Sequence, residues 1–342
     1  MHISAGEPPM LRVHGDIKKI KAPALTVEQT QAMVYDIMGD SQRKIFEEHS
    51  DIDFSIQLGD IARFRVNVYR QNRGLGAAFR QIPTRISSLE ELGMPPILAD
   101  LTRKEKGLVL VTGPTGSGKS TTLAAMIDVI NNELEGHILT IEDPIEFLHV
   151  GKKCLVNQRE IGPHTRSFAN ALRAALREDP DIILVGEMRD LETIQLALTA
   201  AETGHLVFGT LHTSSAPKTV DRIIDVFPPN QQAQVRAMFS ESIQAIITQT
   251  LCKKAGGGRV AALEILLGTT AVRNLIREGK IHQLPSVMQT QQGAGMQTLE
   301  MHLLQLAERN LISRETAIEK CGNPDLFKEI DEGIAARTTK RR

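Results

Sequence analysis

The sequence predicts an α/β protein with two domains, and three observations support this fold class. At 342 residues the chain is long enough for two domains, and its 41% apolar and 24% charged residues are typical of a globular protein. Proline and glycine gather at Pro83 and at 93–96, which marks a boundary between residues 1–95 and 96–342. Beyond that boundary apolar strands alternate with helices, a pattern that implies a parallel sheet covered on both faces. The strands are predicted at 108–111, 138–142, 182–185 and 206–210.

Residues 1–95 carry the pattern of an α+β domain. Met10–Ile17 reads as a strand that enters a turn at Gly15 and Asp16, and Thr26 can cap a helix that extends to about Glu48. Apolar and polar residues then alternate, which predicts strands at 53–56, 63–69 and 76–82. A sheet covered by one helix accounts for this domain.

The segment Gly113–Thr121, called the P-loop below, reads Gly-Pro-Thr-Gly-Ser-Gly-Lys-Ser-Thr and fits the phosphate-binding pattern G-x-x-x-x-G-K-[ST]. Glycines let several backbone N–H groups turn toward phosphate oxygens, and the following helix adds its positive end. Lys119 is placed to reach the β- and γ-phosphates of ATP, and the Ser120 hydroxyl to bind Mg²⁺. An ordinary Gly-rich turn between strand and helix is the alternative, but such a turn does not require all four fixed positions. The candidate nucleotide-binding residues are Gly113, Pro114, Thr115, Gly116, Ser117, Gly118, Lys119, Ser120 and Thr121.

Acidic residues lie at the carboxyl ends of two predicted strands, where the active sites of open parallel sheets gather. The first cluster contains Glu142, Asp143 and Glu146. Three carboxylates this close are costly unless a cation or a water network holds them, and a solvated acidic loop is the alternative. The second is Glu187, which follows the apolar run 182–185 and matches a Walker B acid that would hold Mg²⁺ or polarise the attacking water. A plain strand-end glutamate is the alternative there.

His205 and His212 bracket one predicted strand. Because they are seven residues apart, they are expected at opposite ends of that strand, and a zinc pair is not expected. A histidine near the γ-phosphate could sense it, while a histidine that is merely hydrogen-bonded is the alternative. We take both as site candidates, His212 as catalytic and His205 as nucleotide-binding.

Beyond about Pro229 the chain is expected to be mostly helical. One helix is predicted over 231–250. A strand at 259–267 and helices over 271–279 and 296–310 are predicted to follow, and the basic tail 335–342 is expected to be a frayed, solvated end.

In this order and spacing, the P-loop, the acidic segment 141–147, the Glu187 strand and the segment 205–212 resemble the secretion ATPases of the type II/type IV pilus superfamily. Within it the sequence is most similar to the retraction ATPases of type IV pili, because 271–278 reads AVRNLIRE where that group has AIRNLIRE. Supporting stretches lie at 177–190 and 256–261, so the resemblance covers nearly the whole chain.

The resemblance implies a PAS-like N-terminal domain, a RecA-like ATPase domain with C-terminal helices, and a ring of six subunits. It also implies ATP and Mg²⁺ as cofactors, Glu146 as the base that activates water, and Glu187 as the Walker B acid. Arg65 and Arg80 match family arginines that reach the phosphates, although their strand context alone would make them solvated arginines on a sheet face. Such a protein is expected to be a hexameric motor that drives type IV pilus retraction for twitching motility, docked on an integral platform protein of the inner membrane.

Composition limits the other classes of function. A net charge of −1 and 4% aromatic residues give neither the basic stripe nor the stacking surfaces of a nucleic-acid translocase. Pilus-extension and type II secretion motors are the alternative within the superfamily, but they usually carry a four-cysteine zinc insert, and this chain has three scattered cysteines. A regulatory protein that binds ATP without hydrolysing it is opposed by the presence of Lys119, Glu146 and Glu187.

The expected location is the cytoplasm, at the cytoplasmic face of the inner membrane. No apolar run approaches the ~18 residues of a membrane span, and the first residues lack the pattern of a secretory signal. The cysteines form no C-x-x-C pair and suit a reducing compartment. Relatives usually carry a short helix ahead of the stretch that begins here at Met1, and a ring that packs this helix between subunits is expected to be weaker without it.

Overall fold

The computed structural model of the chain describes residues 1–13, 16–59, 62–82, 85–322, 325, 327 and 328. They form two compact units, Met1–Arg85 with Glu146–Leu148, and Ile86–Ile145 with His149–Arg342. Residues 86–95, expected in the first domain, group with the second unit because Leu89, Leu92 and Met94 pack in its core. The turn expected at Gly15 and the tail 335–342 lie outside the described residues.

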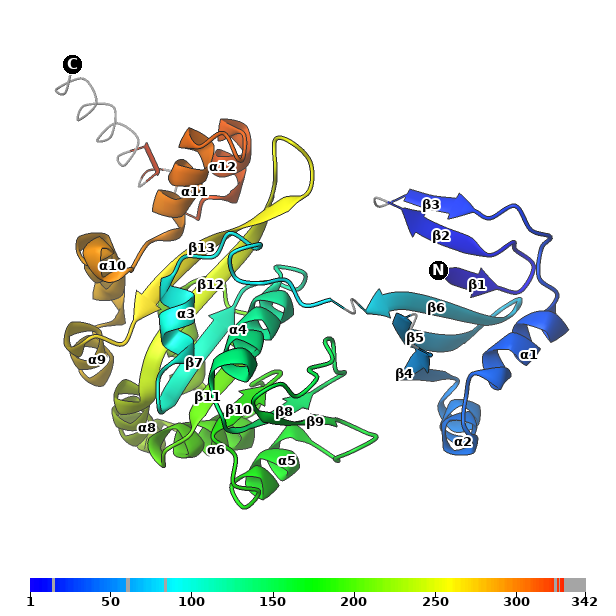
Figure 1. Cartoon of the computed structure of the whole chain (residues 1–342), viewed down its shortest axis with the longest axis horizontal. Coiled ribbons are helices and arrows are strands. Elements are labelled where there is room, and N and C mark those ends of the chain that lie inside the picture. The colour runs from blue at the N-terminus through cyan, green and yellow to red at the C-terminus, as the bar shows by residue number, and fades with distance from the viewer. Residues whose placement is uncertain (14–15, 60–61, 83–84, 323–324, 326, 329–342) are drawn as a thin grey trace. The chain divides into compact units, whose positions relative to one another are not determined.

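The N-terminal unit is built on a six-stranded antiparallel sheet in the order β3-β2-β1-β6-β5-β4 (Figure 1). Its strands are β1 (His2–Ser4), β2 (Met10–Val13), β3 (Asp16–Lys19), β4 (Asp51–Leu58), β5 (Ala62–Gln71) and β6 (Gly74–Ile82). Two helices, α1 (Val27–Asp36) and α2 (Asp40–His49), replace the single helix expected over 26–48, because the chain becomes extended at Gly39. Thr26 caps α1 as predicted, in a reciprocal hydrogen-bonded pair with Gln29.

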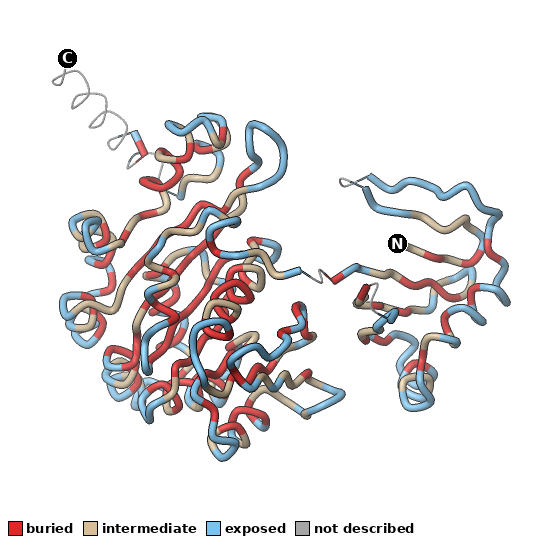
Figure 2. Tube along the Cα trace, viewed as in Figure 1, coloured by how far each residue is buried: buried red, intermediate tan, exposed pale blue. Residues whose placement is uncertain are grey.

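The two faces of this sheet differ in polarity because side chains alternate along each strand. Val66 and Val68 of β5 are fully buried beside Phe46 of α2, whereas Arg63 and Arg65 on the other face are partly exposed. The hairpin of β2 and β3 is mostly exposed and appears largely in pale blue in Figure 2.

The second unit contains a seven-stranded sheet in the order β13-β12-β7-β11-β10-β8-β9, which Figure 1 shows running from yellow β13 to green β9. Its strands are β7 (Gly107–Thr112), β8 (His137–Glu142), β9 (Leu155–Glu160), β10 (Ile182–Val185), β11 (Leu206–Leu211), β12 (Ile243–Lys253) and β13 (Arg259–Leu267). Every neighbouring pair is parallel except β12 and β13. The predicted parallel sheet is therefore confirmed.

Helices cover both faces of this sheet and create two apolar cores. Leu108 and Leu110 of β7 face one core, and Val109 and Val111 face the other. The helices of the second unit are α3 (Ile97–Thr102), α4 (Lys119–Glu133), α5 (Phe168–Ala175), α6 (Leu191–Glu202), α7 (Ala216–Asp225), α8 (Pro229–Ser242), α9 (Thr270–Arg277), α10 (Leu284–Thr290), α11 (Leu299–Glu308) and α12 (Arg314–Lys320), with short 3₁₀ turns η1 (Ile281–Gln283) and η2 (Gln292–Ala294). A membrane-spanning helix, which needs about 20 apolar residues, does not occur in the described part of the chain.

The helix predicted over 231–250 is wrong in its second half. α8 ends at Ser242, and β12 continues from Ile243 as a central strand beside β7. Ile246 and Ile247 are both fully buried, each on a different face of the sheet. A strand buried on both faces shows no alternation, so its periodicity resembles that of a buried helix. The strand predicted at 259–267 and the helices near 271–279 and 296–310 are confirmed as β13, α9 and α11.

Candidate active site

The P-loop joins the buried strand β7 to α4. Gly113 has a φ of +139°, and a Cβ atom there would lie 2.3 Å from the main-chain oxygen of Gln249, so only glycine fits. Gly118 has a φ of +90° and precedes α4 without a side chain that could cap the helix. The first-turn N–H groups of α4, including those of Ser120 and Thr121, are therefore available to an anion.

Lys119 is the first residue of α4, and its side chain folds back over the loop. The ammonium group donates to the main-chain oxygens of Gly113 at 2.9 Å and Pro114 at 3.2 Å, and the residue is 8% exposed. Ser117 is also buried, and within the described chain its hydroxyl has no hydrogen-bond partner. A buried cation and an unsatisfied hydroxyl beside a helix N-terminus are suited to a phosphate group.

Glu187 lies at the same edge of the sheet as the P-loop. β11 separates β10 from β7, with Val185 level with Gly209 and Leu211 level with Thr112. One residue, Gly186, separates Glu187 from the end of β10. Glu187 therefore lies two strand spacings, about 10 Å, from the start of the P-loop. A Walker B acid has to lie close to the P-loop, since both contribute to Mg²⁺ binding, and the role of Glu187 as that acid stays a prediction.

A histidine and an arginine contact the Glu187 carboxylate. His212 Nε2 lies 3.1 Å from Glu187 Oε1, and Arg189 Nε donates to the same oxygen. The pKa of Arg189 is raised by its hydrogen bond to Glu187, and the nearby Asp143 charge adds to this. Glu187 and His212, two candidate catalytic residues from separate motifs, therefore form one cluster.

The three carboxylates after β8 lie in different surroundings. Glu142 accepts hydrogen bonds from Thr140 Oγ1 at 2.6 Å and from Gln158 Nε2 at 3.1 Å, which hold it at the end of the strand. Asp143 is exposed. Glu146 is exposed as well and groups with the N-terminal unit, so its assignment as the water-activating base stays a prediction.

His205 lies at the opposite edge of the sheet. It precedes β11, whose first residue Leu206 is level with Gly107 at the start of β7. Its Nδ1 is 3.0 Å from the main-chain oxygen of Ala200 in α6. The P-loop follows the far end of β7, roughly 17 Å away along the strand. The prediction that the two histidines lie at opposite ends of the strand is confirmed. The prediction that His205 binds the nucleotide of its own subunit is wrong, because His205 lies at the end away from the P-loop.

In the N-terminal unit, Arg65 of β5 and Arg80 of β6 are directly opposite each other. Arg65 Nε lies 3.5 Å from Asp53 Oδ1, and Arg80 is exposed. Like charges opposite each other destabilise a sheet, and one carboxylate offsets only part of that repulsion. Paired guanidinium groups are well suited to an anion such as phosphate. That Arg65 and Arg80 reach the phosphates of the nucleotide stays a prediction.

Glu264 of β13 is a buried carboxylate next to the segment that carries His212. It is 8% exposed and accepts a 2.5 Å hydrogen bond from the N–H of Ala216, the first residue of α7. Burial raises the pKa of Glu264 from an ordinary 4.5 to about 7; the Ala216 hydrogen bond opposes this shift and the charge of Glu300 adds to it. The residue therefore changes protonation state near neutral pH.

Sequence motifs did not reveal every residue at this edge. Arg189 lies in the stretch 177–190 that supports the resemblance, but the sequence assigns it no role of its own, and Gln249 lies in the segment predicted as a helix. A cross-strand contact to a P-loop more than a hundred residues earlier leaves no local signal in the sequence.

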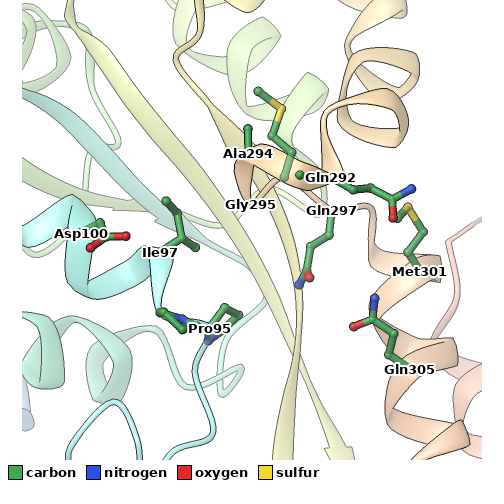
Figure 3. A pocket seen from close by; sticks show the side chains of 12 residues that line it. Pro95, Ile97, Asp100, Gln292, Ala294, Gly295, Gln297, Met301 and Gln305 are labelled. Atoms are coloured by element: carbon green, nitrogen blue, oxygen red, sulfur yellow. The ribbon is translucent and has the colours of Figure 1, made fainter.

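A separate pocket of about 420 Å³ lies between α3 and the C-terminal helices. Figure 3 shows Ile97 and Asp100 on one side of it and Gln297, Met301 and Gln305 on the other. None of its lining residues belongs to the P-loop or contacts Glu187 in the described structure. The phosphate-binding features thus lie outside this pocket.

Comparisons with known proteins agree with this geometry. The sequence model of the family described as type II/IV secretion system protein matches residues 7–340. The type IV pilus retraction ATPase PilT of Pseudomonas aeruginosa is 62% identical over 96% of this chain and 95% of its own length. A twitching motility protein of Neisseria gonorrhoeae is 58% identical over 93% of this chain and 85% of its own length.

Solved structures give the same result. A crystal structure of the pilus retraction motor PilT with bound ADP superposes with a TM-score of 0.91 at 51% identity, and the match covers 96% of this chain and 94% of that one. The ATPase DotB of Legionella pneumophila has a TM-score of 0.79 at 31% identity, over 92% and 89% of the two chains. With the P-loop, the Glu187 cluster and these matches taken together, the chain belongs to the type II/IV secretion system protein family.

Proposed function

We propose that this chain is an ATP-hydrolysing motor that drives the retraction of type IV pili and so supports twitching motility. The observation that carries the ATPase activity is the Glu187–His212 pair, 3.1 Å apart, at the sheet edge that also holds the P-loop. The role in retraction is supported by the 62% identity to PilT over 96% of the chain.

Some residues of the proposed site bind the nucleotide, and others take part in its hydrolysis. The P-loop N–H groups and Lys119 bind the phosphates. Glu146 takes the proton of the attacking water, and Arg65 and Arg80 neutralise charge that develops on the γ-phosphate. His212, which contacts Glu187, senses whether the γ-phosphate is present.

Magnesium fits the oxygen donors at this edge. A hydroxyl and a carboxylate are hard ligands, and Mg²⁺ in nucleotide enzymes is held by one or two such groups together with substrate phosphates and water. Ser120, in the first turn of α4, and Glu187, which is 18% exposed, would hold it. When bound, the ion would supply charge neutralisation at the phosphates, and the Glu187 contacts to Arg189 and His212 orient the carboxylate.

The motor is proposed to act as a homohexamer. Six copies would open and close their nucleotide sites in turn, and the motion would act on an integral platform protein of the inner membrane at the pilus base. The ring would then lie at the cytoplasmic face of that membrane, where ATP is present. The relatives' names, which mention pilus retraction and twitching motility, support this setting.

The test has a biochemical arm and a cellular arm. ATP turnover is measured against protein concentration, with light scattering on the same samples, and turnover per subunit is expected to rise as a species of about six subunits forms. The chain is then expressed in a twitching bacterium that lacks its own retraction ATPase, beside a folded Lys119→Ala variant. Twitching that is restored by the unmodified chain but not by the Lys119→Ala variant supports the proposal. ATP hydrolysis without restored twitching, but with restored piliation in a strain that lacks its extension ATPase, would favour the assembly motor instead.

A further inference from the structure

Gln249 is a buried amide that contacts the P-loop from a neighbouring strand. β12 is parallel to β7, and Thr248 is paired with Thr112, the residue directly before the P-loop. The hydroxyl oxygens of these two threonines are 2.9 Å apart and join the strands at this point. Gln249 follows at once and is 1% exposed. Its position is therefore fixed by the sheet itself.

The amide nitrogen and the amide oxygen of Gln249 both form hydrogen bonds with the phosphate-binding segment. Nε2 donates to the main-chain oxygen of Ser117 at 2.6 Å, and Oε1 accepts from Thr122 Oγ1 in the first turn of α4 at 2.9 Å. The amide thus spans the loop and the helix on either side of Gly118, where an added Cβ would lie 3.0 Å from Nε2. The main-chain oxygen of Gln249 approaches Gly113 even more closely, because an added Cβ there would lie 2.3 Å from it. One residue contacts the beginning, the middle and the end of the turn.

Lys119 also holds the loop, but its side chain has a competing role. Its bonds to Gly113 O and Pro114 O involve the same ammonium group that serves the phosphates. The Gln249 contacts are directed at a carbonyl and a hydroxyl and use no phosphate-binding N–H group. They can therefore persist when the nucleotide is bound.

We propose that Gln249 is a positioning residue for nucleotide binding: it fixes the Ser117 carbonyl and the start of α4, so that the loop N–H groups converge on the phosphates. A preorganised loop binds its ligand more tightly because less ordering remains to be done on binding. This inference rests on nucleotide binding at the P-loop, which is part of the proposed function.

The chain offers a matched control in Asn131, a second buried amide on α4. Asn131 is fully buried, donates to the main-chain oxygen of Val150 at 2.8 Å and accepts from Lys152 N at 2.9 Å. Gln249→Glu and Asn131→Asp therefore make the same change. Each removes an N–H donor that holds a main-chain carbonyl, and each places a carboxylate in a buried position. Only the first of these carbonyls belongs to the P-loop.

The experiment measures ADP affinity by titration calorimetry and stability by urea unfolding for the full-length chain and both variants. We expect both substitutions to lower the free energy of unfolding. Gln249→Glu should raise the Kd for ADP at least about tenfold, while Asn131→Asp leaves it within about twofold of the unmodified chain. Gln249→Met, which keeps the length without the polar atoms, should weaken ADP binding in the same direction, as should Thr122→Val, which removes the donor to Oε1.

Each outcome bears on the inference separately from the proposed function. Unchanged ADP affinity in a folded Gln249→Glu or Gln249→Met variant overturns it. An equal loss of affinity in Asn131→Asp also overturns it, because the effect would then follow from general destabilisation. If both Gln249 variants fail to fold, Thr122→Val decides: unchanged affinity there removes the role. If the unmodified chain itself does not bind ADP, the proposed function fails before Gln249 is tested.

Discussion

Glu187 lies at the centre of the charged cluster in the candidate active site. Its carboxylate contacts Arg189 and His212, and the charge of Asp143 adds to the raised pKa of Arg189. These charged groups follow three neighbouring strands: Asp143 follows β8, Glu187 and Arg189 follow β10, and His212 follows β11. A carboxylate oriented by two partners is well placed to hold a cation through one fixed oxygen.

We therefore expect Glu187→Gln to keep nucleotide binding and to lose turnover. The amide preserves size and hydrogen bonding but carries no charge for Mg²⁺, so turnover should fall at least about 100-fold while the Kd for ADP changes little. Steady-state ATPase assays and ADP titration measure the two quantities. Glu192→Gln is the control, because Glu192 also pairs with an arginine, Arg173, but on the surface of α6. Near-normal turnover in Glu187→Gln would remove the carboxylate from its role.

Glu264 gives a prediction for the pH dependence of stability. Its pKa is raised to about 7 in the folded protein from an ordinary 4.5 in the unfolded chain. Between these two pKa values the folded state binds more protons than the unfolded state, so the free energy of unfolding falls as the pH rises. The stability that protonated Glu264 contributes is fully present below about pH 4.5 and is lost as the pH rises through 7. Glu264→Gln, which cannot ionise, should be similar to the unmodified chain at pH 5 and gain on it by up to about 3 kcal/mol at pH 8.

Urea unfolding of both proteins at the two pH values measures this gain. Titrating groups that do not interact with Glu264 are shared by the two proteins and cancel in the difference. A difference in unfolding free energy that stays constant between pH 5 and pH 8 would contradict the raised pKa.

Among the elements, the P-loop depends on the close approach of two backbones. At Gly113 an added Cβ would lie 2.3 Å from Gln249 O and 2.7 Å from Ser117 Oγ, and φ is +139°. Gly113→Ala should therefore displace the loop from β12 and lower ADP affinity at least about tenfold. Gly256→Ala, in the turn between β12 and β13, has no atom within 4 Å of its added Cβ and should leave affinity unchanged. ADP titration of the two variants tests the contrast; equal affinities would show that the approach at Gly113 is not required.

Local elements and motifs were predictable from the sequence, and cross-strand partners were not. The run 182–185 and the P-loop carry their signals within ten residues, so β10 and the strand–turn–helix around Lys119 are where the pattern placed them. β12 was missed because a strand buried on both faces has no alternation, and Gln249 was missed with it. His205 was misassigned because a motif that covers one whole strand does not say which end serves the site.

For the whole molecule, the two opposed arginines of the N-terminal unit bear on assembly. If Arg65 completes a nucleotide site only in the ring, Arg65→Ala should lower turnover in concentrated, assembled samples and leave the residual rate of dilute monomer unchanged. Turnover against concentration, with light scattering, measures both regimes. Arg73→Ala is a suitable control because Arg73 pairs with Glu7 within the same unit. An equal loss in monomer and ring would contradict a role across subunits.

The pairing of β7 with β12 also has a consequence for synthesis of the protein on the ribosome. Ser117 and its partner Gln249 are separated by 132 residues. At about 5–20 residues per second, roughly ten seconds pass between the two. Throughout that interval β7, whose residues are all buried in the folded protein, lacks the strand that covers one of its edges, and such an edge is prone to aggregate. A chain interrupted before Ile243 would carry a complete P-loop motif and an aggregation-prone strand with an unpaired edge. Without the Gln249 contacts its P-loop would not be held in place, so ATP could not bind there and stabilise the incomplete chain.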